Sequence, residues 1–279
     1  MDVEDIPVGM QLKDATGWNQ LAADWELFLE ARPHGCFVAD QNGTAVGTAT
    51  TIVYDNTVGW VSMVLVDEKH RRRGVGTELL RTALASLEGN CDTIKLDATP
   101  AGRKVYLPLG FRDELTIERR VCTAQCTLVV PSISTGTIET MASDDLAAAL
   151  ALDQRAFGVR RDHLLQSLHA RASEYALVWR ADEEIQAFCC GRHGSRFEQV
   201  GPLVSKDRAG AEVLLAHFGL RAAPNAIVLD TPNRDRSWLQ FLDAAGFQVE
   251  RELVRMFRGD KPHSGDGTLQ WAVAGPELG

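Results

Sequence analysis

The stretch "LVDEKHRRRGVGTELLRTALASL" (residues 65–87) joins a strand-like apolar run to a helix through a basic loop with two glycines, which indicates an α/β unit. After the loop, apolar residues recur at helical spacing, which predicts one buried helix face. They are Val75, Leu79, Leu80, Ala83, Leu84 and Leu87. Backbone amides at a helix start lack intrahelical partners, and the helix dipole adds positive charge there. The loop is therefore either a solvated charge cluster or an anion site.

The order of residues in the loop favours the anion site. Arg71, Arg72 and Arg73 come directly before Gly74, Val75, Gly76 and Thr77. Glycine lets the backbone approach a ligand closely, and guanidinium groups bind phosphate through paired donors. The pattern is neither a Walker A loop nor a complete GxGxxG fingerprint. We expect residues 71–77 to bind a pyrophosphate.

The chain carries the same plan twice. Residues 36–66 predict three strands with turns at Asn42-Gly43 and Asp55-Asn56, since Asn-Gly between apolar runs is typical of a hairpin. Residues 174–205 follow the same order, and the loop and helix at 203–220 correspond to those at 65–87. Chance similarity of two α/β units is the alternative.

The second half of each copy repeats as well. Residues 94–111 and 227–247 both run from Leu-Asp through Thr-Pro to Gly-Phe, and closing strands are predicted at 114–121 and 250–257. We expect an α/β fold with two tandem domains, 1–130 and 137–260, and a linker at 129–137 rich in turn residues. A tail, 261–279, follows, in which 268–274 can add a strand.

Composition narrows the classes of protein. A chain of 279 residues suits two domains, and a net charge of −9 argues against nucleic-acid binding. No apolar run approaches the ~20 residues of a membrane span, and the acidic start lacks the order of a secretory signal. We expect a cytoplasmic protein that binds no nucleic acid or membrane.

The cysteines and histidines predict no metal site. None of the six cysteines lies in a CxxC pair, and we expect buried free thiols in a reducing compartment, ahead of disulfides or zinc. The seven histidines show no metal-ligand spacing. No GxSxG element marks a serine nucleophile either.

Two motifs together resemble a known family. Arg71-x-x-Gly74-x-Gly76 after an apolar strand resembles the cofactor motif of the GNAT acetyltransferases, and Tyr106-x-x-x-Gly110-Phe111 resembles the family's next strand and helix. The doubled plan is similar to the YitH-like subgroup, which has a degenerate second GNAT domain. This resemblance implies a twisted mixed sheet flanked by helices in each domain, with acetyl-CoA as cosubstrate and no metal.

The resemblance also implies roles for individual residues. The backbone of Val64, Leu65 and Val66 would bind the pantetheine arm, and an amide there would polarise the thioester carbonyl. Residues Arg71 to Thr77 would hold the pyrophosphate. Tyr106 would act as the general acid that protonates the departing thiolate, with a core tyrosine as the alternative.

The general base stays open. Asp97 ends the strand before Tyr106 and is a candidate base, but an aspartate there equally suits a helix cap. Relay through water from Asp97 or Ser62 is as plausible. Trp60, Ser62 and Met63 lie on a strand that can face the acceptor, although Trp60 and Met63 equally suit the core.

The second copy has lost both motifs. Its loop, Asp207 to Ala211, has one arginine and no Gly-x-Gly, and Leu242 stands in place of the tyrosine. We expect that this copy does not bind acetyl-CoA but packs on the first domain and walls the acceptor pocket. Polar candidates for such a wall, for which structural roles are favoured, are Arg192, His193, Asp230 and Asn233.

The resemblance therefore implies an N-acetyltransferase in which a primary amine of a small molecule, or a protein amine, attacks acetyl-CoA directly. The alternative is an acyl-CoA-binding sensor without turnover. A nucleotide-binding protein is disfavoured because no P-loop lysine is present. The acceptor, and the choice between monomer and homodimer, stay open.

Overall fold

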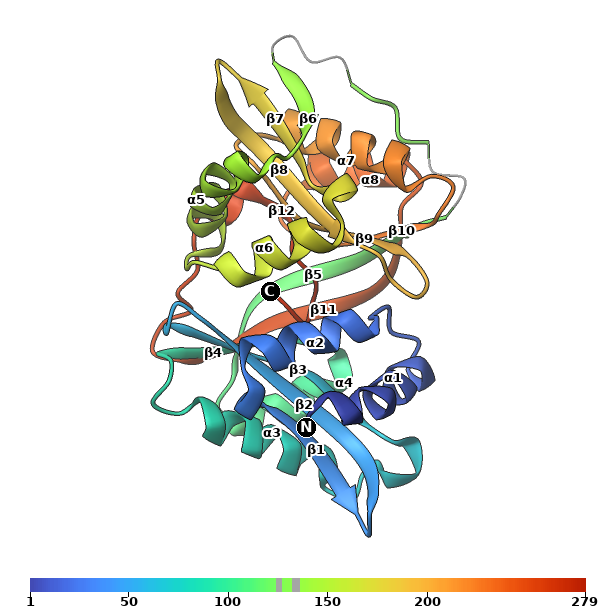
Figure 1. Cartoon of the computed structure of the whole chain (residues 1–279), viewed down its shortest axis with the longest axis vertical. Helices are drawn as coiled ribbons and strands as arrows, with labels where there is room; N and C mark the ends of the chain where they lie inside the picture. Colours follow the sequence, from blue (N-terminus) through green and yellow to red (C-terminus); the bar gives the residue numbers. More distant parts are fainter. Residues whose placement is uncertain (124–126, 132–135) are drawn as a thin grey trace. The chain divides into compact units, whose positions relative to one another are not determined.

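A computed structural model describes residues 1–123, 127–131 and 136–279. The chain forms two compact units (Figure 1). The first contains Met1–Asp113 and Met256–His263, and the second contains Glu114–Arg255 and Ser264–Gly279. Each unit combines a sheet with helices, as predicted. No helix in the described part of the chain has the length and apolar character needed to cross a membrane.

The first unit follows the predicted order of elements. Its strands are β1 (Cys36–Gln41), β2 (Thr44–Tyr54), β3 (Val58–Val66) and β4 (Thr93–Ala98), and its helices are α1 (Ile6–Ala15), α2 (Ala22–Ala31), α3 (Val75–Leu87) and α4 (Pro100–Tyr106). The first three strands are antiparallel neighbours, and β4 runs parallel to β3. Residues Val46 to Ile52 of β2 are all buried, because α3 covers one face of the sheet while α1 and α2 cover the other (Figure 1).

The second unit repeats this order. Its strands include β6 (Thr137–Thr140), β7 (Leu177–Ala181), β8 (Glu184–Arg192), β9 (Glu198–Ser205), β10 (Ile227–Pro232) and β12 (Gln270–Ala272), and its helices are α5 (Leu146–Phe157), α6 (Asp162–Arg171), α7 (Arg208–Ala222) and α8 (Arg236–Ala244). Strand β10 runs parallel to β9, as β4 does to β3. Short 3₁₀ helices span Val3–Asp5, Pro33–Gly35, Glu68–His70, Leu107–Leu109, Ser143–Asp145, Ser173–Tyr175 and Gly267–Leu269.

The two closing strands are exchanged. Strand β5 (Arg112–Cys122) pairs antiparallel with β10 of the second unit, from Ile117↔Pro232 to Cys122↔Ile227. Strand β11 (Gln248–Gly259) neighbours β4, and its last residues, from Met256, belong to the first unit. The compact units therefore differ from the predicted domains 1–130 and 137–260. Strand partners are chosen by long-range contacts, which the local repeat does not encode.

The structure also bears on the expectations for the C-terminal tail, the linker and the cysteines. Strand β12 confirms an added strand within 268–274, whereas residues 132–135 of the linker lie outside the described residues. Free thiols are found at Cys36, Cys91, Cys189 and Cys190, and all except Cys91 are buried. The expectation was wrong for Cys122, which is disulfide-bonded, since a disulfide depends on approach in space rather than on a CxxC spacing. Cys126 lies outside the described residues.

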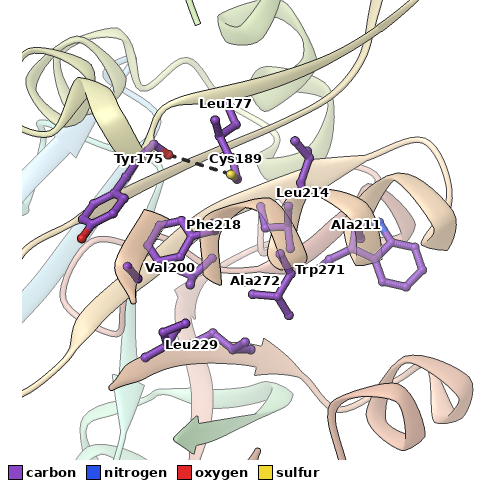
Figure 2. Packing of buried hydrophobic residues seen from close by; sticks show 14 of the residues in the cluster. Tyr175, Leu177, Cys189, Val200, Ala211, Leu214, Phe218, Leu229, Trp271 and Ala272 are labelled. Atoms are coloured by element: carbon purple, nitrogen blue, oxygen red, sulfur yellow. Dashed lines mark hydrogen bonds between the residues drawn. The ribbon is translucent and has the colours of Figure 1, made fainter. Parts of the chain in front are cut away.

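The core of the second unit gathers side chains from strands and helices that are distant in sequence. Leu177 and Cys189 from adjacent strands, Phe218 from α7 and Trp271 from β12 belong to one buried cluster (Figure 2). Burial raises the pKa of the Cys189 thiol to about 12, so this thiol stays protonated at neutral pH. It is a packing residue rather than a nucleophile.

Candidate active site

Strand β3 carries a bulge just before the predicted cofactor segment. Thr48 pairs with Leu65 and Thr50 with Ser62, so Met63 and Val64 together oppose one residue of β2. Met63 has a φ of +50°, and its carbonyl accepts a hydrogen bond from the Thr48 hydroxyl at 2.9 Å. A bulge of this kind redirects the strand and its backbone groups.

Strands β3 and β4 stop pairing shortly before the bulge. They pair only over Val58–Trp60 and Thr93–Lys95, although both strands continue. Of the strands that the structure describes, none pairs with the β4-facing edge of β3 after Trp60. Val64, Leu65 and Val66 therefore lie on a free strand edge, where N–H and C=O groups can bind an extended ligand.

The basic loop follows directly at the end of this edge. Helix α3 begins at Val75, and its N-cap, Gly74, has a φ of +90° and gives no side-chain cap. Arg71, Arg72 and Arg73 are exposed, and Arg71 donates through Nε to the Val66 carbonyl at 3.1 Å. The Arg71 hydrogen bond thus holds the loop against the end of β3, while the arginine side chains stay exposed to solvent.

The space in front of the loop is open. A methyl group added to Gly74 would meet nothing within 4 Å, and one on Gly76 would meet only Val66, at 3.4 Å. The acid before the arginines is already occupied, because Asp67 accepts from His70 Nδ1 at 2.8 Å and from the Lys69 amide at 3.0 Å. The hydrogen bond with His70 holds the pKa of Asp67 below its usual range. The uncapped helix start and the arginines remain available to a phosphate group.

Tyr106 ends helix α4 and is partly exposed. Its ring lies 6.0 Å from that of Phe111, centroid to centroid. A methyl group on Gly102, one turn earlier, would stand 3.0 Å from Tyr106 Cε2, so the glycine leaves room for the ring. No residue of the described ranges forms a hydrogen bond with the hydroxyl. Burial raises the pKa of the phenol to about 12, which keeps it protonated as an acid must be.

Asp97 lies on β4 past the last residue paired with β3, and it is partly exposed. Its alternative role as the helix cap is wrong, because Thr99 caps α4 by accepting from the Gly102 amide at 3.1 Å. The carboxyl ends of parallel strands meet at one edge, so β4 brings Asp97 to the same edge as the cofactor segment of β3. Its role as a base stays a prediction.

The other candidates on β3 are held by the protein. Ser62 is buried and shares a hydrogen bond of 3.1 Å with the Thr50 hydroxyl. Trp60 and Met63 are buried, with 0% and 1% of their surface exposed. Trp60 and Met63 are therefore core residues, as the alternative to an acceptor-facing role predicted.

The second unit differs at each equivalent position. Asp207 caps α7 by accepting from the Gly210 amide at 2.9 Å, where the first unit has exposed arginines and an uncapped glycine. Arg208 pairs with Glu212 within the helix. Leu242 is fully buried. An acid at this helix start opposes an anionic ligand by charge.

The polar candidates of the second unit are held in structural contacts. Asp230 and Arg119 form a buried two-bond ion pair at 2.7 and 2.8 Å. Burial would raise the pKa of the Asp230 carboxyl, but the Arg119 charge and hydrogen bonds hold it below its usual range. The other three candidates are also paired. Arg192 pairs with Glu277, and Asn233 pairs with Glu118. His193 pairs with both Glu174 and Glu198.

A metal centre has no support in the described residues, where no group of three or more His, Cys, Asp or Glu side chains could hold an ion. The expectation of a metal-free site stays a prediction.

Two family models match the chain. Residues 10–111 match "Acetyltransferase (GNAT) family", and residues 149–270 match "Acetyltransferase (GNAT) domain". The matches fall on the two copies of the repeat and together cover most of the chain.

Curated relatives match over a shorter stretch. N-alpha-acetyltransferase 30 of Xenopus laevis is 32% identical over 95 residues, which are 31% of this chain and 35% of the relative. N-alpha-acetyltransferase MAK3 of Arabidopsis thaliana is 30% identical over 94 residues, 31% of this chain and 50% of the relative. The chain thus spans between a third and a half of the length of these relatives.

Solved structures share the fold over the whole chain. A putative acetyltransferase from Pyrococcus horikoshii has a TM-score of 0.83 and 22% identity, with 100% of this chain and 94% of that one covered. A tandem GNAT protein from the clavulanic acid biosynthesis pathway has a TM-score of 0.66 and 14% identity, with 94% and 96% covered. At these identities the similarity shows the fold alone, while the two family models place a GNAT domain in each half of the chain.

Proposed function

Because this chain belongs to the GNAT acetyltransferases and carries two GNAT domains, we propose that its first unit transfers an acetyl group from acetyl-CoA to a primary amine. The amine attacks directly, without an acyl-enzyme. Catalysis is assigned to the first unit, and the second is a degenerate copy.

The residues that would hold acetyl-CoA lie in two neighbouring segments of the chain. The free edge at Val64–Val66 would bind the pantetheine arm through backbone groups, and the loop from Arg71 to Thr77 would bind the pyrophosphate. The open space at Gly74 and the exposed arginines support this assignment. Bound acetyl-CoA would supply a thioester as the acetyl donor.

The protein's own groups have three tasks. A backbone N–H on the free edge of β3 would donate to the carbonyl oxygen as negative charge develops there. The Tyr106 phenol, which has a hydroxyl without a partner in the described residues and a pKa of about 12, would give its proton to the departing thiolate. Asp97 would take the proton from the amine.

One observation carries the proposal. The two units share a bulged strand, a separated neighbour and a following helix, yet only the first has the arginine-glycine loop and the tyrosine. The second unit keeps the fold without them. The fold therefore does not require these residues, and a ligand of the first unit explains them.

Acceptor-dependent release of CoA thiol tests the proposal. Purified chain is mixed with acetyl-CoA and a panel of amines that contains polyamines, aminoglycosides, lysine and short peptides with free α-amines. Peptides belong in the panel because the curated relatives are named N-alpha-acetyltransferases. We expect saturable thiol release with at least one amine.

The variant with Arg71, Arg72 and Arg73 changed to alanine is the control for this assay, and it should lose saturation by acetyl-CoA. Saturable binding without thiol release from any amine would favour the acyl-CoA sensor. Absence of acetyl-CoA binding by the unmodified chain would contradict both functions.

A further inference from the structure

The C-terminal strand β12 occupies an edge of β9 that another strand leaves free. One edge of β9 pairs with β8 along its length, through Phe188↔Val204 and Cys189↔Leu203. The opposite edge pairs with β10 only over Glu198–Val200. Past that point β12 takes this edge, with Gln270 opposite Val204 and Ala272 opposite Leu203.

This edge is the counterpart of the candidate cofactor edge in the first unit. Repeat alignment places Leu203-Val204 at the position of Leu65-Val66. The sheet register agrees, because Leu65 pairs with Thr48 of β2, while Leu203 pairs with Cys189 of the equivalent strand β8. Each strand also has its bulge just before this point. Among the described strands, this edge is thus unpaired in the first unit and paired with β12 in the second.

The segment bonds to both walls of the gap. The Val273 amide donates to the Asp230 carbonyl of β10 at 2.9 Å, and the Thr231 hydroxyl donates to the Trp271 carbonyl at 2.7 Å. On the other wall, Trp271 Nε1 donates to the Ser205 carbonyl of β9 at 3.0 Å. Figure 2 shows Trp271 and Ala272 among side chains of the surrounding core.

Close packing and two buried arginines hold the segment further. A methyl group on Gly201 would overlap the Val273 carbonyl oxygen. Arg192 donates to the Ala274 carbonyl at 2.6 Å and pairs with Glu277. Arg161, itself bonded twice to Asp153, donates to the carbonyl oxygens of Leu278 and Gly279. Backbone pairing, apolar burial and specific polar contacts together define a peptide site.

We propose that the gap between β9 and β10 is a peptide-binding groove whose resident ligand is the chain's own segment 270–279. The groove takes an extended apolar peptide by strand addition and does not take acetyl-CoA. The comparison with the cofactor edge rests on the proposed function of the first unit, whereas occupancy of the groove does not.

A cleavable chain tests the groove. A protease site is inserted between His263 and Ser264, where Ser264 is exposed. After cleavage we expect residues 264–279 to stay bound in native mass spectrometry. Added synthetic peptide 264–279 should raise the unfolding temperature with concentration, because a ligand of the folded state stabilises it by mass action. The same peptide with Trp271→Ala should bind at least roughly tenfold more weakly, since Trp271 is the large buried anchor.

Loss of the fragment on cleavage, with no change in unfolding temperature, would overturn the proposal. So would displacement of the fragment by excess acetyl-CoA. Binding of acetyl-CoA by the first unit is measured in the same sample. If acetyl-CoA does not bind while the fragment stays bound, the result counts against the proposed function but not against the peptide-binding groove.

A second variant tests the groove without cleavage. Gly201→Ala should speed hydrogen exchange at the amides of Trp271 to Ala274, because the methyl group pushes on the Val273 carbonyl. Gly43→Ala is the matched control, since that glycine also has a positive φ, of +79°, but a methyl group there meets nothing within 4 Å. Equal exchange in the two variants would contradict a groove closed by this segment.

Discussion

At the scale of single residues, Tyr106 combines three properties that suit an acid: a hydroxyl without a partner in the described ranges, a partly exposed ring, and protonation at neutral pH. We predict that Tyr106→Phe lowers acceptor-dependent turnover by about 100-fold, the lower end for loss of a positioned acid. Affinity for acetyl-CoA should change little, because the ring remains. Steady-state kinetics and calorimetric titration separate the two effects.

Tyr54→Phe is the control for this prediction. Tyr54 lies at the far end of the hairpin from the cofactor edge, opposite Val58. It should leave turnover unchanged. Equal turnover in Tyr106→Phe and the unmodified chain would remove the acid role.

The raised pKa of Tyr106 also predicts the pH dependence of the rate. Burial favours the neutral phenol and moves its pKa from 10.0 to about 12. The Tyr106 phenol therefore stays protonated as pH rises. The rate should increase with pH as the amine loses its proton, and loss of the Tyr106 proton should cause no decline below about pH 11. A pH–rate profile between pH 6 and 10.5 checks this. A falling limb between pH 8 and 10 that Tyr106→Phe abolishes would contradict it.

Local spacing was enough to predict the helix that starts after the basic loop and the helix that ends at Tyr106, because both follow from short-range patterns. The roles of the loop and of Tyr106 stay predictions. For Asp97, local spacing failed only for the alternative role as a helix cap, since Thr99, two residues later, supplies the cap instead. It also missed the bulge at Met63. A positive φ is uncommon for methionine, and the residue that holds its carbonyl, Thr48, lies on another strand.

At the scale of elements, the start of helix α3 should act as an anion site whose strength depends on charge. We predict that Arg72→Ala weakens acetyl-CoA binding roughly tenfold, as expected for loss of a charge-assisted hydrogen bond. Binding should also weaken as salt rises, because the groups are exposed. Calorimetric titration at low and high ionic strength measures both effects.

Arg81→Ala is the matched control, because it removes the same charge two turns further along the helix. Its side chain is exposed and pairs only distantly with Glu78, at 3.8 Å. The control should bind acetyl-CoA like the unmodified chain. If both variants lose affinity equally, the effect belongs to net charge rather than to the loop.

The sequence predicted most elements well, because hairpin turns and helical periodicity are local signals. Turns at Asn42-Gly43 and Asp55-Asn56 lie between the observed strands, and the apolar stripe of α3 is buried from Leu79 to Leu87. The closing strands were also predicted as strands. Their partners were not, since a β pattern specifies a buried face rather than a neighbour.

At the scale of the whole molecule, each compact unit depends on a strand supplied by the other half of the sequence. Gly259, from the second copy, has a φ of +148°, and a methyl group there would overlap Thr93 Oγ1 of β4. Thr93 also donates to the Lys261 carbonyl at 2.6 Å. The end of β11 is thus packed against β4 in the first unit.

We predict that Gly259→Ala destabilises the first unit by about 2–3 kcal/mol, through steric overlap and an unfavourable φ. Hydrogen exchange at the amides of β4 measures this directly. Gly89→Ala, at a φ of +75° with nothing within 4 Å, controls for the backbone cost alone. Equal protection of β4 in the two variants would show that the exchanged strand does not support this unit.

At this scale we propose that the chain holds one acetyl-CoA site, in the first unit, built from the edge of β3 and the arginine-glycine loop. The stoichiometry of acetyl-CoA binding tests it most directly, measured by native mass spectrometry of the unmodified chain and of the variant with Arg71, Arg72 and Arg73 changed to alanine. We predict one acetyl-CoA per chain, lost in the variant. Two per chain, or one that survives loss of the three arginines, would contradict a single site in the first unit.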